Sequence, residues 1–122
     1  MIKMIFCLRR REGMSLAEFQ DYWFNRHAPL VKKCAPDLRI RRYVQSHRTD
    51  IAELAAAPDA RGCVQPPYDG VAELYWDSAE DVIAVGETKA GRDAGRRLLE
   101  DEHKFIDLAN SPIFWVDARE II

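Results

Sequence analysis

The chain has 122 residues, of which 48% are hydrophobic and 31% are charged, a composition typical of one folded globular domain. The 18 Lys and Arg against 20 Asp and Glu give a formal net charge of −2, so no basic excess exists to neutralise phosphates and we expect no nucleic-acid partner. No apolar run approaches the length of a membrane span, so we expect a cytoplasmic protein that does not bind a membrane.

The first third of the chain predicts a strand followed by a helix. Residues 2–8 alternate between two faces, which is typical of a strand. Ser15 and Glu18 then form a capping-box pattern, which predicts a helix from residue 15 to about residue 28. Pro29 is expected to end or bend this helix, although residues 30–33 are able to add one more turn.

The rest of the chain predicts three strands and two helices. Residues 40–47 and 71–76 alternate as strands, and a long connection with a short helical turn at 51–57 joins them. Such a connection serves as a lid, as an interface or as a plain surface loop, and the sequence leaves these open. Ser78 begins a helix to about residue 85, a longer helix follows Gly91 to about residue 108, and residues 113–122 form the last strand.

The element order β-α-β-β-α-β indicates an α+β fold, the ferredoxin-like split βαβ arrangement, in a single domain over residues 1–122. This fold has a four-stranded antiparallel sheet with both helices on one face. The other face still carries apolar groups at alternate positions, and an uncovered apolar face usually marks an interface. We therefore predict a homodimer that packs sheet against sheet around a two-fold axis.

The predicted helix 15–28 carries a histidine on its apolar stripe. His27 lies four residues after Trp23, so the two side chains share one face. One interpretation is a buried structural imidazole that is hydrogen-bonded in the core, and the residues alone favour it. The other is a general acid or base beside a bound molecule, because histidine titrates nearest neutral pH.

Polar and aromatic groups on the strands provide further candidates. Tyr43, Gln45 and His47 share one strand face, and burying three such groups without partners would be costly, so they are expected to face a cavity, a second subunit or water. Glu73 and Tyr75 share one face of the next strand, but alternation does not say which face of the sheet it is. Aromatic walls with a few polar groups suit a small-molecule pocket, although plain core is the commoner explanation.

Motifs for cofactors and metals are missing from the sequence. The three cysteines form no C-x-x-C pair, and no dinucleotide or phosphate-loop fingerprint is present. His27, His47 and Glu73 are enough for a metal site of two histidines and one carboxylate, but nothing in their spacing requires such a site. We expect neither a metal nor a cofactor.

Three stretches of the chain resemble the EthD-like family, which is named for a protein encoded with an ether-degrading monooxygenase system. The first is Phe19-x-x-Tyr22-Trp23-x-x-x-His27-Ala28-Pro29-Leu30. The second is residues 42–47 with residues 68–78, and the third is Asp101-Glu102-x-x-Phe105-Ile106-Asp107 with the final strand. The resemblance implies a dimeric α+β barrel that holds a small organic molecule between sheet and helices, and it favours a pocket role for His27.

Two main functional hypotheses follow. The first is a cofactor-free enzyme, of the oxidoreductase, monooxygenase-like, decarboxylase or dehydratase type, that acts on a small aromatic or polyketide-like compound. His27 would be its acid or base, and the substrate-binding residues would be Trp23, Tyr43, Gln45, His47, Glu73, Tyr75 and Phe105. The second is a non-catalytic protein that binds or delivers a small molecule to an oxygenase. A filled core in a scaffold dimer is the third possibility.

Overall fold

A computed structural model describes all of residues 1–122 and is built around one antiparallel sheet. The sheet order is β2-β3-β1-β4, and every neighbouring pair runs antiparallel. This order, with helices in the two crossover connections, is the ferredoxin-like arrangement, so the predicted fold class is confirmed. The strands are β1 (Ile2–Leu8), β2 (Arg42–His47), β3 (Gly70–Trp76) and β4 (Ile113–Val116).

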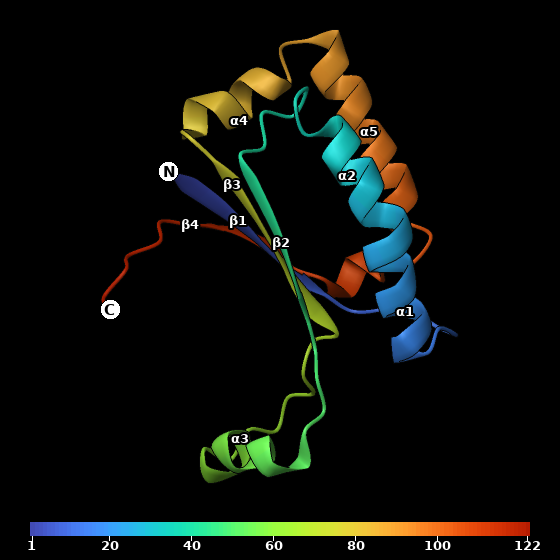
Figure 1. Cartoon of the computed structure of the whole chain (residues 1–122), viewed down its shortest axis with the longest axis vertical. Coiled ribbons are helices and arrows are strands. Elements are labelled where there is room, and N and C mark those ends of the chain that lie inside the picture. The colour runs from blue at the N-terminus through green and yellow to red at the C-terminus, as the bar shows by residue number, and fades with distance from the viewer.

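Helices cover only one face of the sheet. The first crossover consists of α1 (Leu16–Tyr22), a π-helical turn (Trp23–His27) and α2 (Ala28–Cys34), and the second consists of α4 (Ala79–Val85) and α5 (Lys89–Glu102). Figure 1 shows α1, α2 and α5 together on one side of the strands. A 3-10 turn (Leu108–Asn110) leads into β4. None of the helices has the length and apolar character needed to cross a membrane.

The first crossover helix continues past Pro29, which agrees with the alternative of an added turn over residues 30–33. It begins at the expected capping box, in which the Ser15 hydroxyl accepts from the Glu18 amide, but it continues past Pro29 to Cys34. The π turn ends at His27, so Pro29 lies in the first turn that follows. The residues before Pro29 are already helical, so the proline removes one intrahelical hydrogen bond, and it does so next to the π turn, where the regular ladder is already interrupted.

The second crossover differs from expectation at both ends. Gly91 lies inside α5, because Thr88 caps this helix and accepts from the Gly91 amide. The helix ends at Glu102, not near residue 108, because the next residues leave the helix to bond with the chain after β1: the Arg11 amide donates to Phe105 and the Asp107 amide to Arg9. The last strand, β4, is also short and ends at Val116.

The connection between β2 and β3 forms an arm, residues 49–67. It contains a 3-10 turn (Ala52–Ala55) and the short helix α3 (Ala56–Ala60), and Figure 1 shows it extending beyond the end of the sheet. Asp69 is buried at the base of the arm, where it forms ion pairs with Arg10 at 3.0 Å and with Arg48 at 3.1 Å. The two ends of the arm are therefore held together although the arm itself is exposed.

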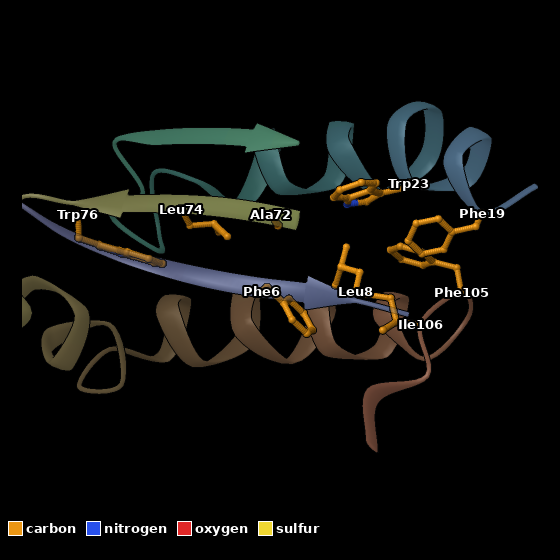
Figure 2. Close-up of a cluster of buried hydrophobic side chains, with 9 residues drawn as sticks. All are labelled: Phe6, Leu8, Phe19, Trp23, Ala72, Leu74, Trp76, Phe105 and Ile106. Carbon is orange, nitrogen blue, oxygen red and sulfur yellow. The ribbon is translucent and has the colours of Figure 1, made fainter. Parts of the chain in front are cut away.

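The side chains of the core lie between the sheet and the helices. Figure 2 shows Trp76 at one end of this cluster and Phe19 with Phe105 at the other. The rings of Phe19 and Phe105 lie 5.6 Å apart, and both side chains are fully buried. Trp23 from the π turn packs over Gly70, at the start of β3, where a Cβ atom would overlap its ring. Aromatic burial of this kind is the main stabilising contribution to a domain of this size.

Candidate functional site

A cavity of about 250 Å³ lies between the sheet and the helices. Fifteen of its 18 lining residues are hydrophobic, and they come from all four strands and from the helices above them. The exposed lining residues are Leu99 of α5 and Ile113 of β4, so the cavity opens between these two elements. Side chains therefore leave part of the interior unfilled. The lining residues are Met4, Phe6, Leu8, Trp23, His27, Val31, Leu38, Ile40, Tyr43, Ala72, Leu74, Trp76, Gly95, Leu98, Leu99, Glu102, Ile106 and Ile113.

The π turn brings both Trp23 and His27 into the wall of this cavity. In the wider turn, the Ala28 amide donates to the Trp23 carbonyl, five residues back. The same carbonyl also accepts from Nε2 of Gln45 on β2 at 3.0 Å. Single π turns inside longer helices occur frequently at functional sites. Both side chains are almost fully buried, with 1% of Trp23 and 5% of His27 exposed.

His27 is held by a buried carboxylate on α5. Its Nδ1 donates to Oδ2 of Asp101 at 2.7 Å, and Tyr22 donates its hydroxyl to the other oxygen, Oδ1, at 2.6 Å. A carboxylate only accepts, so Nδ1 carries the proton and the other ring nitrogen of neutral His27 carries a lone pair. That second nitrogen has no hydrogen-bond partner in the protein, and the side chain borders the cavity.

The environment keeps His27 neutral at physiological pH. Burial lowers the pKa of His27, and this effect outweighs the nearby Asp101 charge, which raises it. Although burial acts to raise the pKa of Asp101, the hydrogen bonds from Tyr22 and His27 lower it overall. Burial and Asp101 together raise the pKa of Tyr22 to about 12. The result is a neutral imidazole, protonated only at Nδ1 and oriented by an ionised carboxylate, which is the arrangement of a general base.

Tyr43 adds a hydroxyl group to the cavity, and Gln45 and His47 lie behind it. Gln45 donates to the Tyr43 oxygen at 2.8 Å, and its own Oε1 contacts Nε2 of His47 at 2.8 Å. Neither Gln45 nor His47 lines the cavity, and the His47 ring packs on Trp23 with 4.4 Å between centroids. The Tyr43 hydroxyl has no acceptor in the protein, so its proton is available to a bound molecule.

Three other predicted substrate-binding residues do not line the cavity. Phe105 is completely buried and packs against His27, with 5.0 Å between the ring centroids. It therefore contacts the imidazole without lining the cavity. Glu73 and Tyr75 project from the uncovered face of the sheet, contrary to the expectation that they join the site. The reason is alternation: Ala72, Leu74 and Trp76 occupy the helix-covered face of β3, so the residues between them must point the other way. There Tyr75 donates to Glu73 at 3.0 Å, and Lys3 pairs with Glu73 at 3.7 Å.

The structure brings two acidic residues to the site that the sequence placed in a family-like stretch without a site role. Asp101 orients His27, and Glu102 is an ionisable group of the cavity lining together with His27 and Tyr43. Burial, with the charge of Asp101 adding to it, raises the pKa of Glu102 to about 7. Asp101 follows Leu98 by three residues and Glu102 follows it by four, so both fall on or beside the buried stripe of α5. An acidic residue on the apolar face of a predicted helix is the sequence feature that indicates Asp101 and Glu102.

The candidate metal ligands are not assembled. His27 lines the cavity, His47 packs on the Trp23 ring outside the lining, and Glu73 lies on the uncovered face of the sheet. No group of three His, Cys, Asp or Glu side chains is placed to hold an ion.

The fold and the cavity define a ferredoxin-like α+β protein with an apolar pocket under its helices, and comparisons with known proteins give its family. The EthD domain model matches residues 11–109, so the chain belongs to the EthD family. A search of curated proteins found no match.

Solved structures share the fold at low sequence identity. An EthD-family protein from Bacillus halodurans is 20% identical with a TM-score of 0.62, covering 98% of this chain and 99% of its own. An EthD-like protein from Ralstonia eutropha is 18% identical with a TM-score of 0.59, covering 95% and 89%. A protein from Bacteroides fragilis, described as dimeric with a ferredoxin-like fold, is 10% identical with a TM-score of 0.59, covering 96% and 95%.

Proposed function

We propose that this protein is an enzyme that binds a small, mostly apolar organic molecule, aromatic or polyketide-like, in the cavity and transforms it by acid–base chemistry through His27. The single observation that supports this most strongly is the orientation of His27: Asp101 holds one ring nitrogen at 2.7 Å, and the other is left free at the cavity. A purely structural histidine would be expected to use both nitrogens in hydrogen bonds.

The size and chemistry of the cavity support the ligand class. A dry cavity of about 150 Å³ already accommodates benzene, and this cavity measures about 250 Å³. It therefore has room for a molecule of one or two rings. The aromatic and aliphatic walls favour an apolar body, while the Tyr43 hydroxyl provides a hydrogen bond for one oxygen atom of the ligand.

The first experiment measures thermal unfolding with a panel of one- and two-ring phenols, quinones and ketones. A ligand at 100 times its dissociation constant adds about 2.7 kcal/mol, which raises the Tm of a domain this size by roughly 10 °C. Each hit is then followed for conversion by wild type, His27→Gln and the control His103→Gln, an exposed histidine near the end of α5. We expect His27→Gln to retain binding within a few-fold but to lose about 10²–10⁴-fold in turnover.

Delivery of a small molecule without chemistry is the second candidate, and the predominance of hydrophobic lining favours it. In that case the hydrophobic lining residues contribute more to ligand binding than the His27 imidazole does. Trp23→Ala would then abolish binding, and no compound that binds wild type would be converted. Conversion that depends on His27 would exclude this alternative.

We further propose that the protein forms a homodimer through the uncovered face of the sheet. That face carries Ile5, Val44 and Val71 around the Lys3–Glu73 pair. Figure 1 shows the arm and the C-terminal segment on the same side, away from α1, α2 and α5. Exposed apolar residues on the arm, Ile51, Leu54 and Val64, fit a partner surface. Light scattering at micromolar concentration should give twice the mass of one chain, and the mass of a single chain would contradict the proposal.

A further inference from the structure

Glu102 is the one side chain of the cavity whose chemistry the proposed function does not use. It projects from the last turn of α5 into the lining, while its neighbour Asp101 binds His27. The carboxyl group of Glu102 makes no hydrogen bond or ion pair within the protein, although the side chain is largely buried. A buried carboxyl without a partner is costly in its ionised form, so the environment favours the protonated form.

The charged and titratable groups around Glu102 are few. His27 faces the same cavity from the π turn and is neutral, and Asp101 is adjacent on α5. Tyr43 faces it from β2, close enough that the charge of Glu102 contributes to raising the pKa of Tyr43 after the larger effect of burial. The strands β1, β3 and β4 contribute only apolar side chains to the lining.

The lining holds no lysine or arginine, which restricts the ligand. An anionic molecule would enter a site with no cation to pair with, beside the Asp101 carboxylate, and burying such a charge unpaired is strongly unfavourable. The cavity therefore suits a neutral molecule. The available groups are one base, His27, one carboxylic acid, Glu102, and one hydroxyl donor, Tyr43. A neutral ketone with a C–H bond next to its carbonyl matches all three.

We propose that His27 and Glu102 act as an acid–base pair that moves a proton between carbon and oxygen of a neutral cyclic or aromatic ketone bound in the cavity. His27 takes the proton from the carbon beside the carbonyl, and the C–H electron pair becomes the C=C bond of an enol. The carbonyl π electrons move to oxygen, which takes the proton from Glu102, while Tyr43 donates a hydrogen bond to that oxygen. The enol, protonated His27 and ionised Glu102 carry the same atoms and electrons as the starting groups, and no oxidant or reductant is needed.

The protonation states required for this step are those that the surroundings favour. Burial lowers the pKa of His27, so the base is free, and it raises the pKa of Glu102 to about 7, so near neutrality a large fraction of the acid keeps its proton. When the surroundings lower the pKa of one group and raise the pKa of its neighbour, the first is usually assigned as the base and the second as the acid.

The inference rests on the proposed function, and the test separates the two. 1-Indanone, a neutral two-ring ketone with exchangeable protons beside its carbonyl, is incubated in D₂O with wild type, His27→Gln, Glu102→Gln and the control Glu100→Gln, an exposed glutamate of α5. Proton NMR follows deuterium incorporation at that carbon. Binding is measured in parallel from the fluorescence of Trp23 and Trp76, which line the cavity.

We expect wild type and Glu100→Gln to accelerate exchange equally, and His27→Gln and Glu102→Gln each to slow it by about 10²-fold while binding 1-indanone within a few-fold of wild type. The rate of wild type should also fall as pH rises past 7, where Glu102 loses its proton, and Glu102→Gln should lack this fall. If wild type binds 1-indanone but exchanges its protons no faster than His27→Gln does, the acid–base pair is overturned. Binding of a small molecule in the cavity would still stand. Wild-type exchange in Glu102→Gln would remove Glu102 from the mechanism, and no binding of 1-indanone at millimolar concentration would overturn the ligand class along with the pair.

Discussion

Asp101 and His27 are 74 positions apart in the chain, yet the Asp101 carboxylate accepts from His27 Nδ1 at 2.7 Å inside the core. The same carboxylate accepts from the Tyr22 hydroxyl at 2.6 Å. Asp101 of α5 therefore bonds both to the last residue of α1, Tyr22, and to the last residue of the π turn, His27. The contact fixes which ring nitrogen of His27 faces the cavity, and it therefore decides whether the histidine is able to act as a base.

Replacing Asp101 with Asn should lower the pKa of His27 further, because the mutation removes the negative charge that raises it. NMR titration of the imidazole measures this shift. The free energy of unfolding should fall by about 1–3 kcal/mol, since a buried hydrogen-bond network is disrupted. Asp93→Asn is the matched control, because Asp93 lies on the same helix and forms only the exposed pairs with Lys89 and Arg96. An unchanged His27 titration in Asp101→Asn would contradict the role assigned to this carboxylate.

Replacing Gly70 with Ala should displace Trp23 and destabilise the protein. The added Cβ would overlap the Trp23 ring, lying 2.8 Å from Cη2 and still closer to Cζ3, and overpacking of this kind costs about 1–3 kcal/mol. Denaturant unfolding and Trp fluorescence report the two effects. The control is Gly95→Ala in α5, where nothing lies within 4 Å of the new atom. That variant should be stabilised by about 0.5–1 kcal/mol, because alanine loses less backbone entropy in a helix.

Glu102→Gln should stabilise the protein at high pH only. The pKa of Glu102 is about 7 in the folded state against 4.5 for the free group, so both states hold the proton below pH 4.5. As pH rises from 4.5 to 7 the unfolded state releases its proton first, and stability is lost. Gln resembles the protonated carboxyl and avoids this loss, so the variant should exceed wild type by about 1–3 kcal/mol at pH 8 but match it at pH 4.5. Urea midpoints at both pH values measure the difference, and a pH-independent gain would count against a raised pKa. Glu100→Gln provides the baseline.

Val71→Lys should convert the proposed dimer to single chains. Val71 lies on the uncovered face of β3, so the substitution places a charge in the middle of the proposed contact. Ile83→Lys, at an exposed position of α4, is the control and should leave the mass unchanged. Sedimentation over a range of concentrations distinguishes the two. If both variants and wild type share one mass, the uncovered face is not the interface.

The sequence by itself determined the order of the elements, the helix caps at Ser15 and Ser78, and which residues share a strand face, because alternation, helical periodicity and capping act over a few residues. It also placed Trp23 and His27 together, since they are four residues apart in one helix. It did not determine the end of α5 at Glu102, because that end depends on backbone bonds to Arg9 and Arg11 far away in the chain.

Only the tertiary structure decided which polar residues meet at the cavity. Strand periodicity paired Glu73 with Tyr75 correctly but left their face open, and the direction of packing put both on the uncovered side. Asp101 and Glu102 are adjacent in sequence, yet the helix rotation between them sends one carboxylate to His27 and the other to the cavity. Such contacts between distant segments depend on how the helices dock on the sheet, and no local pattern in the sequence records that geometry.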